Sequence, residues 1–267
     1  MNTVLLRHTW RRNRGRLVVV SLAMTAWGAL APIIYATFGS TFAGLFQSGA
    51  LPEGLASFGG GDLFSMTGVV ALAFIHPIAI FLVSIFAVGF ASGAVAGERQ
   101  RGTLEVLLSR PLSRYQVYAT LTFSALAFVG LVLTALLLGA LVSAALLGVL
   151  GEIQIGRVPL AWLNAFLLYG AFTAIGLAAS VSCDRSGPAL GATLAVVLVS
   201  YFLEVLGGLW PDAAFLRPYS LFHYLQIQQV LGGHADPRAF ALLATVAIAA
   251  VGLALVVFPR RDLAAPS

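Results

Sequence analysis

The chain has 267 residues, of which 60% are hydrophobic and 9% are charged, and its formal net charge is +5. Soluble globular domains carry roughly 25% charged residues, so the composition excludes that class and indicates an integral membrane protein. The positive charge does not indicate a nucleic-acid partner. All 15 basic residues are arginines, and they lie beside long apolar runs, as the positive-inside rule expects.

The chain lacks the residue patterns that several kinds of enzyme and metal site require. Lysine is absent, so the chain cannot contain a Walker A loop, whose lysine contacts the nucleotide phosphates. If ATP drives this protein, another polypeptide binds the ATP. The hydrolase patterns G-x-S-x-G and H-E-x-x-H are missing, and neither the histidines nor the lone Cys183 has metal-ligand spacing. We expect no catalytic residue, no metal site and no cofactor in this chain.

Apolar runs of about 20 residues predict membrane-spanning helices, and six such runs follow one another. The first run is longer than the ~7–15 apolar residues of a signal peptide, so we interpret it as a retained span. The third is longer than a perpendicular crossing requires, and we expect it to tilt or to project into the cytosol. The chain 1–267 is thus predicted to be one all-α transmembrane domain with spans at 17–38, 69–96, 117–150, 160–182, 188–209 and 239–258.

The arginines predict the orientation of these spans. With the N-terminus inside, twelve arginines fall in cytoplasmic segments, and only Arg157, Arg217 and Arg238 fall outside. Both termini are therefore expected in the cytoplasm. The cytoplasmic set is Arg7, Arg11, Arg12, Arg14, Arg16, Arg99, Arg101, Arg110, Arg114, Arg185, Arg260 and Arg261.

Two segments outside the spans are predicted to lie at the membrane surface. Residues 4–14 can form an interfacial helix, with Trp10 at headgroup depth and the arginines on anionic lipid; a simple positively charged flank is the alternative. Residues 210–238 are rich in aromatic side chains, which suits an interfacial or re-entrant segment. Pro211 and Pro218 argue against a seventh continuous span there.

Three glycines and two ionisable residues inside the spans are candidates for function. Gly89, Gly93 and Gly97 are spaced by four residues, so they share a helix face that another backbone can approach closely. That face is either ordinary packing within the chain or a sliding or dimer-forming seam. His76 and Glu204 lie at membrane depth and are candidates for a substrate path. The alternatives are a hydrogen-bonded interior histidine and a paired or snorkelling glutamate.

The segment 97–116 is unusual because it gathers six charged residues between two apolar runs. Gly102 can supply a sharp turn, after which Thr103 is a plausible N-cap with Glu105 in the first turn. Pro111 ends this short, apolar helix, and Ser113 opens the next helix with a capping box. An apolar patch rimmed by charge is typical of an interaction site; a loop on the membrane surface is the alternative.

This segment, GERQRGTLEVLLSRPLSR, resembles the cytoplasmic signature of type-2 ABC exporter permeases, roughly E-x-E-x-G-T-x-E-x-L-L-S-x-P-[VLI]-S-R. Gln100 departs from it, since the pattern usually has a second acid there. The ending FPRRDL (258–263) and the outer YSLFHYL (219–225) are similar to two weaker family patterns. Within the family the chain looks closest to multidrug and copper-enzyme-maturation permeases. The matching residues are Glu98, Gly102, Thr103, Glu105, Leu107, Leu108, Ser109, Pro111, Ser113 and Arg114.

The resemblance implies a half-transporter in the cytoplasmic (inner) membrane of a prokaryote. Two six-span permease subunits, identical or paralogous, would pair, and each would rest on a separate soluble P-loop ATPase subunit that holds ATP and Mg. The coupling helix between spans two and three would dock into this ATPase and switch the spans between inward-facing and outward-facing states. The residues expected to couple the two subunits are Glu98, Gly102, Thr103, Leu104, Glu105, Val106, Leu107 and Leu108.

Two other functions compete with this one. An ion-coupled secondary carrier would use His76 and Glu204, although such carriers usually have more ionisable groups deep in the bundle. A non-transporting membrane anchor would recruit a cytosolic partner through residues 97–116. The substrate is not indicated by any residue pattern.

Overall fold

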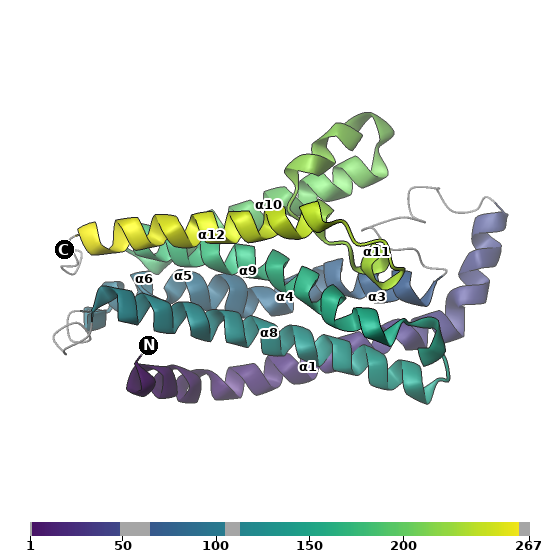
Figure 1. Ribbon diagram of the computed structural model, residues 1–267, viewed down its shortest axis with the longest axis horizontal. Coiled ribbons are helices and arrows are strands. Elements are labelled where there is room, and N and C mark those ends of the chain that lie inside the picture. The colour runs from purple at the N-terminus through teal and green to yellow at the C-terminus, as the bar shows by residue number, and fades with distance from the viewer. Residues whose placement is uncertain (1, 49–64, 105–112, 262–267) are drawn as a thin grey trace.

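Long helices lie side by side along one axis and form an elongated bundle (Figure 1). The computed structural model describes residues 2–48, 65–104 and 113–261, and the regular structure in those ranges is helical. Five helices are long and apolar enough to cross a membrane, and a bent pair of helices supplies a sixth span if it is counted as one. The prediction of an all-α membrane protein is confirmed.

Four of the predicted spans match single helices closely. Their ends differ from the predicted boundaries by at most four residues, which reflects how clearly long apolar runs are delimited by charge and proline. The helices are α8 (Arg114–Leu146), α9 (Val158–Ser182), α10 (Ser186–Leu209) and α12 (Pro237–Arg260).

The first helix differs from the prediction because it is continuous. Helix α1 runs from Thr3 to Gln47, so residues 4–14 extend the first span and do not form a separate helix in the membrane interface. The reason is packing: the ring centroids of Trp10 and of Phe128 in α8 lie 4.9 Å apart, and Thr9 and Asn13 are buried. These contacts hold the beginning of α1 against the bundle.

The second span is broken at His76. Helix α3 (Met66–Ile75) and the helices from Pro77 to Gly93 are bent by 47° relative to each other. The second part consists of α4 (Pro77–Ser84), a π-helical turn η2 (Ile85–Phe90) and α5 (Ala91–Gly93). Proline lacks a backbone N–H, so a break at Pro77 leaves carbonyl groups without helical partners.

Neighbouring side chains satisfy the backbone groups at this break. Trp27 of α1 donates its Nε1–H to the carbonyl oxygen of Ala73 at 3.0 Å, and the Tyr169 hydroxyl of α9 donates to that of Phe74 at 2.7 Å. His76 is the N-cap of α4, where its Nδ1 accepts from the Ile78 N–H at 3.3 Å. His76 is only partly buried and this hydrogen bond lies within its own turn, so its role in a substrate path stays a prediction.

Glycines bring α1 and α8 into backbone contact. A Cβ atom at Gly28 would lie 2.1 Å from the Leu136 carbonyl oxygen, and one at Gly139 would lie 2.1 Å from that of Thr25. Only glycine permits this approach. The predicted seam is different: a Cβ at Gly93 would meet nothing within 4 Å, and the π-helical turn containing Gly89 alters the spacing of four. Within the described part of this chain, Gly89, Gly93 and Gly97 do not form a packed seam, and the dimer-forming seam stays a prediction.

The connections at the end of the bundle opposite the termini are short helices (Figure 1). Helices η3 (Leu150–Glu152) and η4 (Ile155–Arg157) join α8 to α9. Between α10 and α12 lie the 3-10 helices η5 (Pro211–Tyr219) and η6 (Phe222–Tyr224), then α11 (Ile227–Leu231). Helix η5 folds back on the end of α10, and α11 packs against α3 and α9. The prediction of a non-spanning segment between spans five and six is consistent with this arrangement.

Removing the Tyr169 hydroxyl tests whether the break at His76 depends on neighbouring side chains. Tyr169→Phe leaves the buried Phe74 carbonyl without its donor, and we expect a loss of about 1–3 kcal/mol in the free energy of unfolding. Thermal unfolding of the purified protein in detergent measures the change. Tyr115→Phe, at an exposed position, is the matched control; equal stability of both variants would contradict this account.

Candidate functional site

The chain leaves the second span through a second break, and one side chain of α9 holds it there. After α5 the backbone makes a turn at residues 94–95 before α6 (Ala96–Gln100) begins. The N–H groups of Val95 and Ala96 donate to Ser180 Oγ at 2.9 and 3.0 Å, and Ser180 is fully buried. Unpaired backbone groups in an apolar environment are costly, so this serine determines where α6 starts.

Glu98 on α6 gathers positive and polar side chains from three directions. Its Oε1 lies 3.1 Å from Arg12 Nη1 of α1 and 2.5 Å from Arg101 Nη2. The Thr103 hydroxyl contacts its Oε2 and its carbonyl oxygen. Burial alone would raise the pKa of Glu98, but the hydrogen bonds from Thr103 and Arg101, the charge of Arg101 and the bond from Arg12 lower this pKa overall.

Gln100 joins the same segment to α10. Its Oε1 accepts from the Ser186 N–H at 3.1 Å and from the Ser186 hydroxyl at 2.9 Å. Ser186 is the first residue of α10, where backbone N–H groups lack helical partners. An acid at this position could make the same contacts and would also favour the helix N-terminus electrostatically. Gln100 makes these hydrogen bonds without carrying a charge.

Asp184 links α6 to the ends of α9 and α12. Its Oδ1 lies 2.7 Å from Arg99 Nη1 and 2.5 Å from Arg261 Nη2. Arg261 also donates to the Val181 carbonyl oxygen at 3.0 Å. At the start of α8, Arg114 Nη1 lies within 3.1 Å of three carbonyl oxygens at the end of α12, those of Phe258, Pro259 and Arg261.

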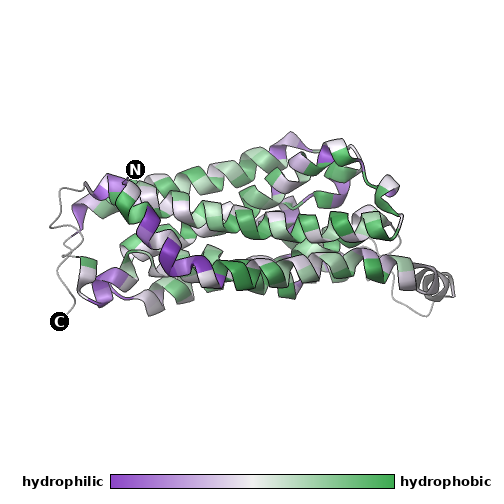
Figure 2. Ribbon diagram, turned by 90° about the horizontal axis from the view of Figure 1, so that it is seen from below, coloured by the Kyte–Doolittle hydropathy of each residue, from purple (hydrophilic) through white to green (hydrophobic). Residues whose placement is uncertain are grey.

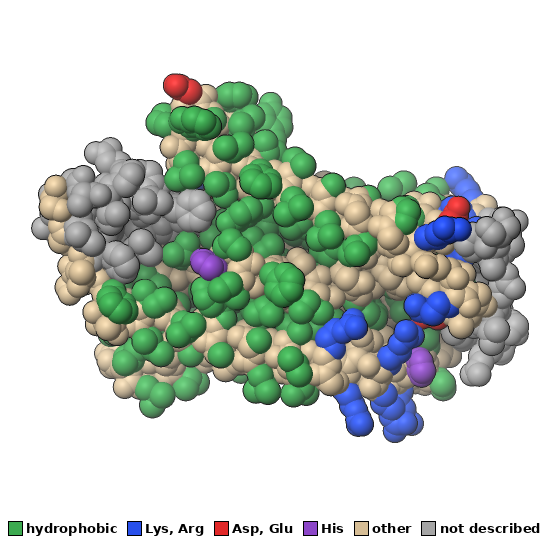
Figure 3. Space-filling view, turned by 180° about the vertical axis from the view of Figure 1, so that it is seen from behind, with side chains coloured by type: hydrophobic (Ala, Val, Ile, Leu, Met, Phe, Trp, Pro, Cys, Tyr) green, Lys and Arg blue, Asp and Glu red, His purple; other side chains and the backbone are tan. Residues whose placement is uncertain are grey.

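These contacts bring residues far apart in sequence to one end of the bundle, where arginines gather in the view of Figure 3. We call this set the end network. It connects the exit of the second span to α1, α8, α9, α10 and α12 within the described residues. Its members are Arg12, Glu98, Arg99, Gln100, Arg101, Thr103, Arg114, Ser180, Asp184, Ser186 and Arg261.

The predicted coupling helix begins next to the end network. Gly102 has a φ angle of +70°, which confirms the predicted turn. Thr103 is already helical and its hydroxyl contacts Glu98, so it does not occupy the predicted N-cap position. Leu104 is 1% exposed and packs in a core cluster with residues of α8, α9 and α12. This burial anchors the segment to the bundle, and the expected role of Leu104 in coupling stays a prediction.

Part of the coupling segment lies outside the described residues. The structure does not describe residues 105–112, and this range contains Glu105, Val106, Leu107, Leu108 and Pro111. The chain is described again from Ser113, which forms the predicted capping box: its Oγ accepts from the Gln116 N–H at 3.1 Å, and Gln116 Oε1 accepts from the Ser113 N–H. The two ends of the segment are thus fixed by Gly102 and Ser113.

Glu204, the second substrate-path candidate, belongs to an ion pair between α10 and η5. Its side chain is 5% exposed, and its Oε1 accepts from Arg217 Nη2 at 2.7 Å and Nε at 3.1 Å. His223 Nδ1 lies 3.7 Å from Oε2. The pKa of His223 is lowered, mainly because the imidazole is partly buried. The charge of Glu204 acts to raise this pKa, and the charge of Arg217 acts to lower it further. The pair holds η5 against α10, which matches the paired alternative for Glu204.

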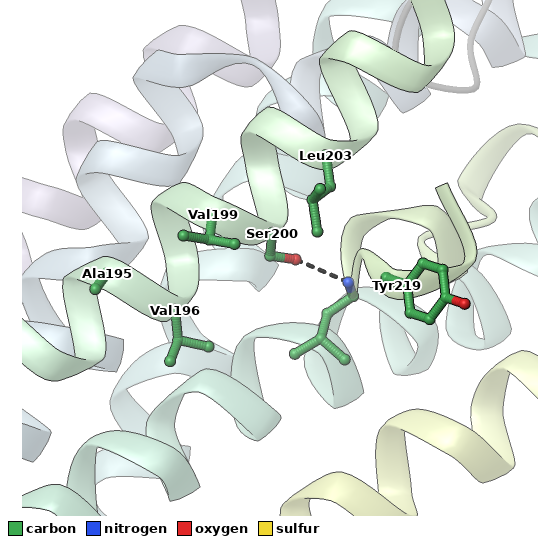
Figure 4. A pocket seen from close by; sticks show the side chains of 7 residues that line it. Ala195, Val196, Val199, Ser200, Leu203 and Tyr219 are labelled. Atoms are coloured by element: carbon green, nitrogen blue, oxygen red, sulfur yellow. Dashed lines mark hydrogen bonds between the residues drawn. The ribbon is translucent and has the colours of Figure 1, made fainter. Parts of the chain in front are cut away.

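A shallow cavity of about 300 Å³ lies between α10 and residues 219–221. Figure 4 shows that its walls are mostly aliphatic, and the Ser200 hydroxyl there already accepts from the Leu221 N–H at 2.8 Å. Neither His76 nor Glu204 lines this cavity. The cavity is lined by Ala195, Val196, Val199, Ser200, Leu203, Tyr219 and Leu221.

Three residues of the end network, Ser180, Asp184 and Ser186, were not anticipated from the sequence. Ser180 is one of several small polar residues in α9, and the sequence favoured no particular one as a partner for a break elsewhere. Asp184 did carry a signal, because it is the sole acid in the short connection between α9 and α10. In the part of the chain that the structure describes, no three His, Cys, Asp or Glu residues group as metal ligands would.

Comparison with known proteins gives a family for nearly the whole chain. The family model described as "ABC-2 family transporter protein" matches residues 9–263. The match includes the entire end network and every helix long enough to span a membrane in the described residues, except the first six residues of α1. No curated protein matches the chain.

Acidification tests the role of Glu98 in the end network. Its pKa is lower in the folded protein than its usual value of 4.5, so its stabilising contribution is present above that value and is lost as the pH falls through the folded pKa. We expect Glu98→Gln to lower the unfolding temperature at neutral pH, with a difference from the unmodified protein that shrinks on acidification. Asp212→Asn, at an exposed site, should show no such trend; a pH-independent difference for Glu98→Gln would contradict the assignment.

Neutralising Glu204 tests its ion pair with Arg217. Glu204→Gln removes the charge that faces Arg217, and charged hydrogen bonds contribute about 1.5–3 kcal/mol. Amide hydrogen exchange in residues 211–219 should therefore accelerate by at least about tenfold. Asp212→Asn in the same segment is the control. Unchanged exchange in Glu204→Gln would mean that the ion pair does not hold η5 in place.

Proposed function

Because this chain belongs to the ABC-2 family of transporter proteins and is the membrane permease component of an ABC transporter, we propose that it forms half of an exporter. In this proposal ATP and Mg are bound by a separate soluble P-loop ATPase subunit. Two permease copies, or this chain and a paralogue, pair in the cytoplasmic membrane of a prokaryote. The lack of lysine in this sequence, and so of a Walker A loop, supports the proposal that a separate subunit binds the nucleotide.

The observation that carries the proposal is the end network. A partner that displaces the segment after the second span acts at the same time on five other helices, because α6 is joined to α1 by Arg12, to α10 by Gln100 and to α12 through Asp184. A partner can shift a conformational equilibrium only by stabilising one state more than the other. The end network provides the contacts through which such a difference can reach all the spans.

The proposed orientation places the end network in the cytoplasm. Helix α1 begins and α12 ends at the same end of the bundle (Figure 1), and arginines are concentrated toward that end on the face in Figure 3. Positive residues favour the cytoplasmic side of a membrane protein. Six spans, with the bent pair counted as one, would place both termini there, next to the coupling segment and the ATP supply.

The ion-coupled alternative has less support. A coupled carrier needs an ionisable group that is free to gain and lose an ion at membrane depth. Glu204 is engaged by Arg217, and His76 caps α4 at the break in the second span. Both side chains are therefore engaged in structural contacts. A residue that carries the coupled ion would have to be free of such contacts.

Two kinds of substitution separate docking from transmission. Glu105→Ala with Leu107→Ala removes the apolar and acidic side chains expected to dock into the ATPase, and we expect the two subunits to no longer co-purify. Asp184→Asn with Gln100→Ala leaves that surface intact but breaks the end network. This variant should keep the ATPase bound, while transport by the complex in vesicles, measured per ATP hydrolysed, falls by about tenfold.

The control is Arg238→Gln, an exposed change at the opposite end of the bundle, which should affect neither measurement. Transport that continues without any ATPase subunit, and that stops when a protonophore is added, would reject the exporter in favour of the ion-coupled carrier. ATPase binding without ATP-dependent transport would favour a membrane anchor.

A further inference from the structure

The first turns of α1 carry an excess of positive charge. Five arginines lie between residues 7 and 16, and α1 contains no acidic residue. Arg12 pairs with Glu98 of α6 at 3.1 Å. The other four, Arg7, Arg11, Arg14 and Arg16, are exposed and form no ion pair with an acid in the described ranges. Their guanidinium groups are therefore available to an external anion.

Three of these arginines share the outward face of α1. Arg7, Arg11 and Arg14 are spaced by four and three residues, which places them on one side of a helix. We call them the arginine stripe. The opposite side of the helix is fixed against the bundle, because Thr9 and Asn13 are buried there. The arginine stripe therefore points away from the protein.

The outward face changes from apolar to cationic within about one turn. Val18 and Leu22 continue the line of the arginine stripe along α1, and they are 57% and 65% exposed. Exposed aliphatic side chains of a membrane helix face lipid tails, and arginines beside them reach the headgroups. The arginine stripe is thus placed where a lipid with its tails along α1 would present its phosphate.

The position of α1 favours lipid over a soluble partner. The Asn2 N–H donates to Thr120 Oγ1, almost two turns into α8 from its start at Arg114. The hydrophilic turns of α1 therefore lie beside the bundle and not beyond its end, as Figure 2 shows. A subunit that docks onto the segment 97–116 approaches the end of the bundle, whereas the arginine stripe faces sideways.

From this geometry we propose that the arginine stripe binds the phosphate groups of anionic phospholipids. Guanidinium groups match phosphate oxygens with paired hydrogen bonds. Three such groups on successive turns can contact more than one headgroup. Bound lipid would compensate the charge on α1 that Glu98 leaves unpaired, and this binding does not depend on whether the protein is an exporter.

Native mass spectrometry of the full-length protein in detergent tests the proposal. The probes are short-chain phosphatidylglycerol and phosphatidylcholine, and bound lipid is counted per chain. We expect the unmodified protein to prefer phosphatidylglycerol. Arg7→Gln with Arg11→Gln and Arg14→Gln should reduce this preference by at least about tenfold, since one arginine near an anionic surface contributes roughly a fivefold factor. The matched control, Arg157→Gln with Arg185→Gln and Arg238→Gln, removes equal charge elsewhere and should keep the preference.

Several outcomes would overturn the proposal. One such outcome is that the variant with Arg7→Gln, Arg11→Gln and Arg14→Gln still prefers phosphatidylglycerol to phosphatidylcholine. Excess inorganic phosphate could displace phosphatidylglycerol completely, which would indicate a site for a free anion. The variant could keep its lipid preference and lose ATPase binding, which would indicate a protein-docking surface. If that variant does not fold, the unmodified protein decides: its preference should weaken as salt screens the arginines, and a salt-independent preference contradicts the proposal.

Discussion

The structure depends on how backbone groups are satisfied where the second span is interrupted. In a membrane, a broken helix exposes N–H and C=O groups that water cannot reach, so neighbouring side chains must bond them. Trp27 and Tyr169 do this for the carbonyls before Pro77, and Ser180 does it for the amides of Val95 and Ala96. The two breaks therefore require α1 and α9 to lie where they do.

The same breaks explain how the exit of the second span becomes connected to the rest of the bundle. Because Ser180 fixes the start of α6, the charged residues that follow are held at defined positions next to other helix ends. Glu98 then meets α1, Gln100 meets α10, and Asp184 connects Arg99 to Arg261. A π-helical turn between the two breaks is a further irregularity, of a kind that is frequent at functional sites. Irregular backbone in the second span is thus directly joined to the segment proposed to bind the ATPase.

The sequence predicted those features that depend on local patterns. Long apolar runs delimit α8, α9, α10 and α12, and local spacing revealed the turn at Gly102 and the capping box at Ser113. It did not predict contacts between distant residues: Ser180 lies more than 80 positions from its partners, and the packing of Trp10 on Phe128 makes α1 continuous. The burial of Leu104 against α8, α9 and α12 was likewise not predicted, because it depends on residues that are distant in the sequence.

The distance between the beginnings of α1 and α10 tests the central claim, that the end network transmits the state of the ATPase to the spans. Spin labels at positions 15 and 187 fit open space, with Cys183→Ser removing the native thiol. In the complex with the ATPase, trapping ATP should change this distance in the otherwise unmodified protein, and the change should disappear in Gln100→Ala with Asp184→Asn. The account would be contradicted if the distance did not change when ATP is trapped, or if it changed equally in the variant.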